Sequence, residues 1–335
     1  MTLMSVGDLS KSFQMRRHST ELKLALQRYG TEATTGRTAD LAQTVKGDFT
    51  AVAGLERSLT QLDGYRTATN EAAAFAAAMQ QTLATVGTLA SGGASGLIQA
   101  SMSTSANVIL SAGIDVKQRF VSAVAALNTR AADRALLGGA ATTTAAIVPA
   151  EDILVELRAL TAGMTSAAGI DAAVVAWFDD PAGYETLAYR GSPTPLAPFQ
   201  LGEGEDVSLT ISANNSQIRD TLKGLALGAL VGEGALGLDR PEQMALARRA
   251  GEHMLTADTS ITYLRADLGA VEARIDEAAT RNAAESAALQ LALSAIVSVD
   301  PYEVASALQE TQTQLETLYT ITARMSRLHL VDFLR

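Results

Sequence analysis

The two ends of this chain resemble each other and differ from its middle. Both ends have the apolar spacing of an amphipathic helix, whereas Gly-, Pro- and Thr-rich sequence lies between them. Along residues 302–333 the apolar positions recur at alternating intervals of three and four residues. That is the period of a helix packed lengthwise on a partner helix. This C-terminal seam consists of Val304, Leu308, Leu315, Leu318 and Met325, with Thr311 and Thr322 at its remaining positions.

Residues 1–29 have the same spacing in two separate stretches. It is kept at Val6, Leu9 and Phe13, is lost at Arg16 and Thr20, and resumes at Leu22, Leu26 and Tyr29. Residues 1–45 carry six Lys and Arg against four Asp and Glu, a net charge of +2, whereas residues 300–335 carry three against five, a net charge of −2. The opposite signs suit two helices that lie side by side, although each exposed ion pair contributes little.

Composition excludes several classes of function. The chain has no Cys, so disulfides, thiolate metal sites and cysteine nucleophiles are excluded. A net charge of −10 argues against a nucleic-acid partner, which requires a basic stripe. The first twenty residues hold Asp8 and no apolar core of a signal peptide, and apolar runs such as residues 72–79 are too short to span a bilayer. The sequence predicts a soluble protein without membrane insertion, and 4% aromatic residues suit long thin helices.

In the first half of the chain, glycines mark the expected helix ends. The first helix is predicted to end at Gly30, with a turn-rich joint at residues 31–40. The helical period returns from Leu41, and residues 91–96 (SGGASG) are predicted to break it. A third helix is expected to reach about Asn128, and residues 140–149 form a Thr/Ala linker.

The second half is predicted to hold short elements and then one long helix. One or two short helices are expected in residues 150–180, and strands at residues 185–189, 197–201 and 207–211. Helix returns at residues 216–230, and a long periodic helix follows Pro241. Residues 299–301 end that helix, because the residue before a proline avoids helical geometry.

No catalytic, cofactor-binding or metal-binding constellation emerges from these patterns. Residues 232–237 fit GxGxxG, but a helix is expected before them where the dinucleotide fingerprint requires a strand, so a loop is the better interpretation. His18, His253 and His329 share no ligand spacing. We therefore expect no enzyme activity, no cofactor and no metal.

Four stretches resemble the flagellin superfamily of axial proteins. Residues 26–36 resemble its first-helix exit, and residues 127–139 (LNTRAADRALLGG) are similar to its "LxNT…GxxLFGG" helix end. Residues 189–192 (YRGS) resemble a "YxGD" hairpin, and residues 308–334 look like a closing helix with an "LSLxx[FY]L" ending. Within the superfamily the chain is most similar to the family that joins hook to filament, hook-associated protein 3. The family's acidic-Pro segment is missing, since residues 37–48 are RTADLAQTVKGD.

This resemblance implies a mainly α fold, an elongated antiparallel helical rod with a small β-bearing central insert. Residues 1–45 and 300–335 would form the paired terminal helices, 46–140 and 215–299 the inner rod, and 141–214 the outer insert. The chain would be exported by the flagellar type III apparatus, with a chaperone on its C-terminal helix. It would then form a helical layer at the extracellular hook–filament junction, between hook-associated protein 1 and flagellin.

The terminal seams are the predicted assembly interface, because seams this thin should order by packing on neighbouring subunits. The interface residues are Leu9, Phe13, Leu22, Leu26, Leu308, Leu315, Leu318, Met325, Leu328 and Phe333. Two alternatives stay open. One is a filament-forming flagellin, which abundance would distinguish, and the other is a secreted enzyme on a flagellin-like rod.

Overall fold

A computed structural model describes residues 6–233 and 239–333, with the side chains of residues 10–233 and 239–325. The chain forms two compact units. The first consists of residues 1–62 and 284–335, and the second of residues 63–283. The division falls within α3 (Thr50–Ser101) and α8 (Arg240–Val297). The domain boundaries predicted from the sequence, at residues 45 and 300, stay a prediction.

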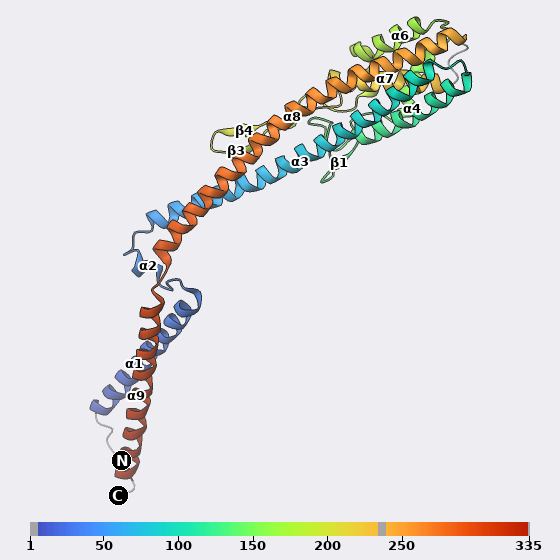
Figure 1. The fold of residues 1–335 in the computed structure, drawn as a ribbon. Helices are drawn as coiled ribbons and strands as arrows, with labels where there is room; N and C mark the ends of the chain where they lie inside the picture. The colour runs from blue at the N-terminus through green and yellow to red at the C-terminus, as the bar shows by residue number, and fades with distance from the viewer. Residues whose placement is uncertain (1–5, 234–238, 334–335) are drawn as a thin grey trace. The chain divides into compact units, whose positions relative to one another are not determined.

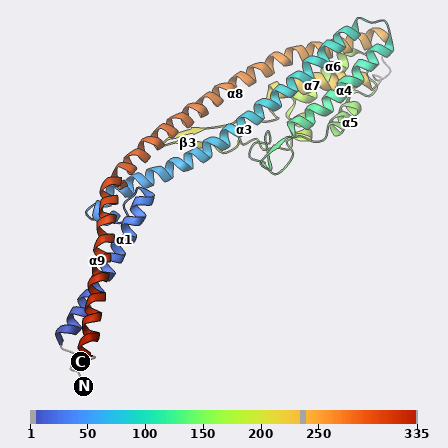
Figure 2. The same ribbon diagram turned by 60° about the horizontal axis from the view of Figure 1, so that its bottom comes forward.

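In the first unit, the two terminal helices pack side by side along their length. Helix α1 (Val6–Thr35) and helix α9 (Pro301–Phe333) run in opposite directions (Figures 1 and 2). Thr322 Oγ1 lies 4.0 Å from Met15 Sδ, and the Lys23 ammonium lies 5.9 Å from the centroid of the Tyr319 ring. The expected mainly α fold with paired terminal helices is thus confirmed.

The first helix is longer than the sequence predicted. It does not end at Gly30 but continues to Thr35, and the residue that follows it, Gly36, has φ +68°. A glycine ends a helix where it supplies that left-handed conformation, and Gly30 has no positive φ. Part of the expected joint at residues 31–40 is therefore helical.

After Gly36, a short extended segment ties the N-terminal chain to the C-terminal chain. Thr38 N donates to Val297 O at 2.8 Å, and Val299 N donates to Gly36 O at 3.1 Å. These bonds form an antiparallel bridge between Arg37 and Ser298. Helix α2 (Leu41–Thr44) follows, and its cap Asp40 accepts from Gln43 N at 3.0 Å. The bridge fixes the register of the two chain segments directly before α9, which begins at Pro301, one residue before the predicted helix of residues 302–333.

In the second unit, α3 passes through the glycines that were predicted to break it. The helix continues from Thr50 to Ser101 without interruption at residues 91–96. A Cβ on Gly93 would lie 3.2 Å from both Met254 Sδ and Val116 Cγ2. The glycines therefore let neighbouring helices approach α3 closely, and this packing offsets their low helix propensity.

Helix α7 (Ser216–Gly232) is the central helix of this unit, buried from Thr221 to Val231. It packs on α4 (Ala106–Leu127), the third helix, which ends where it was predicted to end. Neighbouring helices approach α7 most closely at three glycines spaced four residues apart, Gly224, Gly228 and Gly232. A Cβ on Gly228 would lie 2.5 Å from Val116 Cγ1, and one on Gly224 would lie 2.8 Å from Met254 Cγ.

The insert is partly as predicted. Helices α5 (Ala150–Thr161) and α6 (Ala167–Asp179) confirm the two short helices, and strand β3 (Phe199–Gly202) overlaps the expected second strand. It pairs antiparallel with β4 (Glu205–Val207), so the third expected strand is wrong beyond Val207. A second small hairpin, β1 (Arg130–Ala131) with β2 (Arg134–Ala135), was not predicted.

The first expected strand, residues 185–189, is wrong. These residues belong mostly to the short π-helix η1 (Pro181–Ala188). Asp180 caps this helix by accepting from Ala182 N at 2.8 Å, and Pro181 stands at its first position. A capped start with proline favours a helical turn over a strand.

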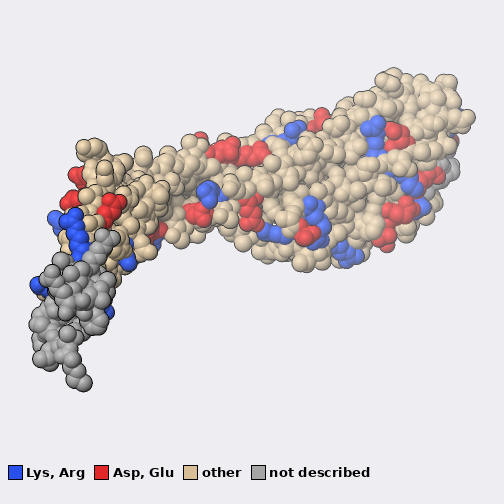
Figure 3. Space-filling model, turned by 90° about the horizontal axis from the view of Figure 1, so that it is seen from below, with Lys and Arg blue, Asp and Glu red and all other residues tan. Residues whose placement is uncertain are grey.

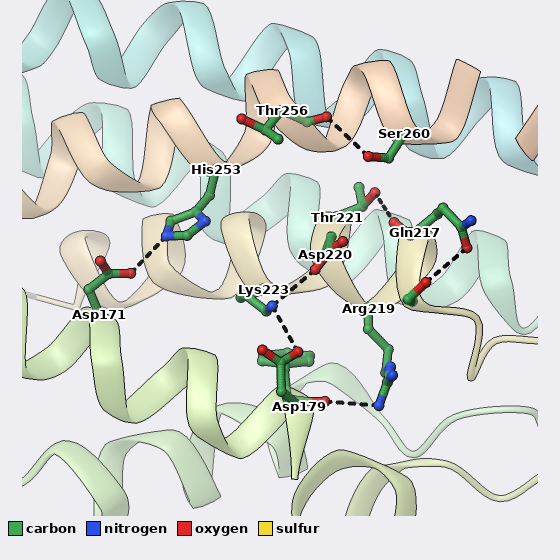
Figure 4. Close-up of polar contacts among 12 residues, drawn as sticks. Asp171, Asp179, Gln217, Arg219, Asp220, Thr221, Lys223, His253, Thr256 and Ser260 are labelled. Atoms are coloured by element: carbon green, nitrogen blue, oxygen red, sulfur yellow. Dashed lines mark hydrogen bonds and ion pairs between the residues drawn. The ribbon is translucent and has the colours of Figure 1, made fainter. Parts of the chain in front are cut away.

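Ion pairs attach α6 to α7 and α8 within the second unit (Figure 4). The Lys223 ammonium lies 2.9 Å from Asp179 and 3.0 Å from Asp220. Toward the N-terminal end of α6, Asp171 lies 2.8 Å from the His253 ring (Figure 4). Asp171 also pairs with Arg249 at 3.0 Å. His253 is therefore a hydrogen-bond partner of Asp171 that helps to position the insert.

Candidate assembly surface

The C-terminal seam of α9 faces α1 within the same chain. Val304 and Thr311 on this seam are buried, whereas Leu308, Leu315, Leu318 and Met325 are half-buried. Packing on α1 therefore covers only part of these apolar side chains. The remainder is available for contact with a neighbouring molecule.

The two apolar stretches of α1 lie on opposite faces of the helix. Leu22 is 7% exposed, whereas Phe13 is 68% exposed. Nine residues correspond to two and a half turns of an α-helix, which places Phe13 half a turn away from Leu22. This offset explains why the spacing is lost at Arg16 and Thr20. Leu22 and half-buried Leu26 belong to the inner face, and Phe13 belongs to the outer face.

Three predicted interface residues lie beyond the described side chains. Leu9 is within α1, and Leu328 and Phe333 are within α9. The structure describes the backbone of these residues alone. Their role in an interface stays a prediction.

Among the described side chains of these helices, four further large apolar residues are exposed and were not predicted to lie in the interface. Leu24 is 60% exposed, Tyr302 is 81% exposed, Tyr319 is 50% exposed and Ile321 is 45% exposed. Leu24 follows Phe13 by eleven residues, or about three turns, so both stand on the outer face of α1. That spacing of eleven residues was present in the sequence, but Leu24 does not belong to the apolar period of Leu22, Leu26 and Tyr29 around it.

A groove lies between α1 and α9 beside the seam. It has a volume of about 320 Å³ and is lined by His18 of α1 and by Thr313, Gln314, Thr317, Leu318 and Ile321 of α9. Leu318 is thus both a seam residue and a wall of the groove. Its lining is a mixture of apolar side chains and hydrogen-bonding groups, a surface suited to another protein segment.

The charges around this surface are exposed and locally paired. Arg17 Nε donates to Glu21 Oε1 at 2.9 Å, and this hydrogen bond lowers the pKa of the Glu21 carboxyl below its ordinary value. On the face shown in Figure 3, the visible acidic and basic side chains of the described residues are interspersed and form no continuous basic stripe.

The remaining described residues give no sign of other site chemistry. In the described ranges, no group of three or more His, Asp or Glu could hold a metal ion. No helix among these residues is long and apolar enough to cross a membrane. Of the GxGxxG stretch, residues 234–237 lie outside the described residues, and so does the side chain of His329.

Fold and surface together define a mainly α protein whose paired terminal helices present partly covered apolar side chains. Comparison with known proteins adds a match to one family model over the C-terminal part of the chain. Residues 253–334 match the model of the bacterial flagellin C-terminal helical region. This match spans all of α9 and more than half of α8. No curated protein matches the sequence.

Two solved structures share the fold. One is a protein of Vibrio parahaemolyticus described as a flagellar hook-associated protein, with a TM-score of 0.53 and 10% sequence identity, covering 72% of this chain and 93% of that one. The other is FlgL of Bacillus cereus, with a TM-score of 0.53 and 14% identity, covering 72% of this chain and 100% of that one. At these identities the likeness is one of fold.

Proposed function

We propose that this chain is a structural protein of the bacterial flagellum that joins hook to filament. The observation that carries the proposal is the match of residues 253–334 to the flagellin C-terminal helical region. The same residues supply α9, whose seam is half-buried against α1. Paired terminal helices with incompletely covered seams suit a subunit that completes its packing on neighbours.

The partners belong to this proposal. On the hook side the chain binds hook-associated protein 1, on the filament side it binds flagellin, and copies of the chain form one helical layer between them. A chaperone covers the C-terminal helix before export through the flagellar type III apparatus. The exposed Tyr319 and Ile321 on α9 support such a chaperone contact, because exposed apolar side chains on a helix are a common binding surface.

The division of labour along the chain is part of the same proposal. Residues 1–45 and 300–335 make the contacts between subunits, residues 46–140 and 215–299 form the inner rod, and residues 141–214 form the outer insert. The interface residues are Leu9, Phe13, Leu22, Leu26, Leu308, Leu315, Leu318, Met325, Leu328 and Phe333. The role is structural rather than catalytic.

A filament-forming flagellin is the alternative that the family match supports equally well. The two roles differ in amount, since a filament consists of many more copies than a junction layer. Quantitative mass spectrometry of sheared flagella therefore separates them. A junction protein is a minor species there, whereas a flagellin is the major one.

The direct test is electron microscopy of a strain that lacks this chain, with an assay of the culture medium. We expect completed hooks without filaments and monomeric flagellin in the medium, because flagellin is still exported but has no layer on which to assemble. If the deletion strain contains no flagellin at all, in the cells or in the medium, the deleted chain is itself the flagellin that forms the filament. Normal attached filaments would contradict both roles.

A further inference from the structure

Phe13 is a large apolar side chain that the chain itself leaves uncovered. It is 68% exposed and lies on the outer face of α1, away from the face that packs on α9 through Leu22. Phe13 therefore cannot reach the groove beside its own α9. A large aromatic side chain in this position gains most when a partner removes it from water.

The groove between α1 and α9 offers a receptor for such a side chain. Its volume of about 320 Å³ exceeds roughly tenfold the 30 Å³ that one water molecule occupies in the liquid, so a side chain can enter it. Leu318 and Ile321 give it apolar walls, and His18 closes it on the α1 side. The protruding ring and the groove lie on different surfaces of the same unit.

We propose that Phe13 of one copy inserts into the groove formed by His18, Leu318 and Ile321 of a second copy. This inference rests on the proposed function, because it specifies how copies of the chain pack within their layer. The protruding side chain and the receptor lie on different surfaces, so the contact is heterologous. Heterologous contacts repeat along a helix instead of closing into a dimer, as a layer on a helical assembly requires.

Charge complementarity supports a second copy in the same orientation as the first. Exposed Arg16 and Arg17 follow Phe13 by about one turn, and exposed Glu310 stands one turn before Gln314 of the groove. Helices α1 and α9 run in opposite directions, so the residues after Phe13 extend toward lower numbers of the receiving α9. Insertion of Phe13 thereby carries the two arginines toward Glu310.

The first test measures self-association of the purified full chain by sedimentation over a range of concentrations. Phe13→Ala should weaken association by about ten- to a hundredfold, the factor expected from exposing one buried aromatic side chain. Leu24→Ala is the matched control, since Leu24 is 60% exposed on the same helix face but lies about 16 Å further along α1 than Phe13. Both variants should keep the thermal unfolding of the parent. Equal association of the parent and of Phe13→Ala would overturn the inference.

The second test locates the contact. A photoreactive benzoylphenylalanine at position 13 keeps an aromatic ring there and links covalently to whatever surrounds it. In a mixture of isotopically labelled and unlabelled chains, we expect crosslinks between copies, mapped by mass spectrometry to residues 313–321. Crosslinks to position 13 of the second copy, or to another surface, would overturn the inference and leave the proposed function standing.

Absence of self-association at every concentration would also overturn this inference. The deletion strain tests the flagellar role independently of self-association. Failure of this inference can therefore be distinguished from failure of the proposed function.

Discussion

At the scale of single residues, two glycines decide how closely α4 and α7 approach each other. A Cβ on Gly113 would lie 2.3 Å from the backbone nitrogen of Gly232, and one on Gly232 would lie 2.3 Å from the carbonyl carbon of Gly113. No side chain fits at such distances, and the obstacle is backbone that cannot rotate away. The contact packs the most buried helix of the second unit against its neighbour.

Replacing Gly113 should therefore destabilise the second unit. We expect Gly113→Ala to lower the free energy of unfolding by about 1–3 kcal/mol, the usual cost of overpacking. Gly64→Ala is the matched control, because a Cβ there meets nothing within 4 Å. That change should leave stability unchanged or raise it by about 0.5–1 kcal/mol through helix propensity. Thermal denaturation measures both, and equal melting temperatures for the two variants would contradict the close contact.

Tyr184 links the insert to its core through a buried hydroxyl. Its side chain is fully buried, and its hydroxyl donates to Ala213 O at 2.9 Å. Burial raises the pKa of the Tyr184 phenol above its ordinary value of about 10. A raised pKa in the folded state means that this group stabilises the fold below pH 10 and that the contribution is lost as the pH rises further.

The alkaline stability of Tyr184→Phe tests this burial. At pH 7 the variant should lose about 1 kcal/mol with the hydrogen bond. Above pH 10 the parent should lose up to about 1.4 kcal/mol per pH unit through this group, and the variant should not. The stability difference between them therefore shrinks between pH 10 and pH 11. Tyr263→Phe, at an exposed tyrosine, is the control. A constant difference between parent and Tyr184→Phe would contradict the prediction.

At the scale of elements, the sequence predicted the helices whose apolar period is uninterrupted. Helix α7 begins at its predicted residue, α8 begins one residue before Pro241, and Pro301 marks the start of α9. The errors concern glycine and short elements. Gly30 and residues 91–96 do not end helices, because tertiary packing or a later glycine decides where a helix stops. Hairpins of two-residue strands leave no period that a sequence could reveal.

The candidate surface was partly predictable for a related reason. The seam of α9 keeps one helical phase, so Leu315 and Leu318 could be placed on one face from spacing alone. The seam of α1 changes phase between Phe13 and Leu22, and the spacing does not tell which part faces inward. The groove depends on how α1 and α9 are offset along each other, which local sequence does not determine.

The two terminal helices should exchange hydrogen faster than the inner part of α8. Among the described side chains of α9, Val304 and Thr311 alone are buried, whereas Leu264, Leu268 and Ile275 are all buried in α8. Ordering the backbone costs about 1–2 kcal/mol of conformational entropy per residue, and the few buried side chains of α9 offset little of that cost. Hydrogen exchange on dilute monomer measures this difference. Equal protection of residues 315–325 and residues 264–275 would contradict the prediction.

At the scale of the whole molecule, the two units differ in how completely they bury their apolar side chains. The second unit has a continuous core built around α7 and holds the insert by ion pairs. In the first unit, apolar side chains of α1 and α9 stay partly uncovered. Folding and assembly therefore depend on different side chains. Changes on the terminal seam should spare the unfolding of the second unit and affect contacts between copies and partners.

The central claim is that the seam of α9 is needed for assembly. The most direct measurement is electron microscopy of cells that carry Leu315→Asp with Leu318→Asp in place of the parent chain. Burying each leucine on assembly is worth about 1.5–3 kcal/mol, so losing both should weaken docking roughly a hundredfold or more. Gln309→Asp with Thr320→Asp is the matched control, since both residues are exposed on the opposite face of α9.

Secretion is assayed in parallel, because the same helix is the proposed chaperone site. The account predicts that the leucine double variant is exported, leaves hooks without filaments and sheds flagellin into the medium. Thermal unfolding of residues 46–299 should stay nearly unchanged. The control double variant should build attached filaments. Full-length attached filaments on cells with the leucine double variant would contradict the account.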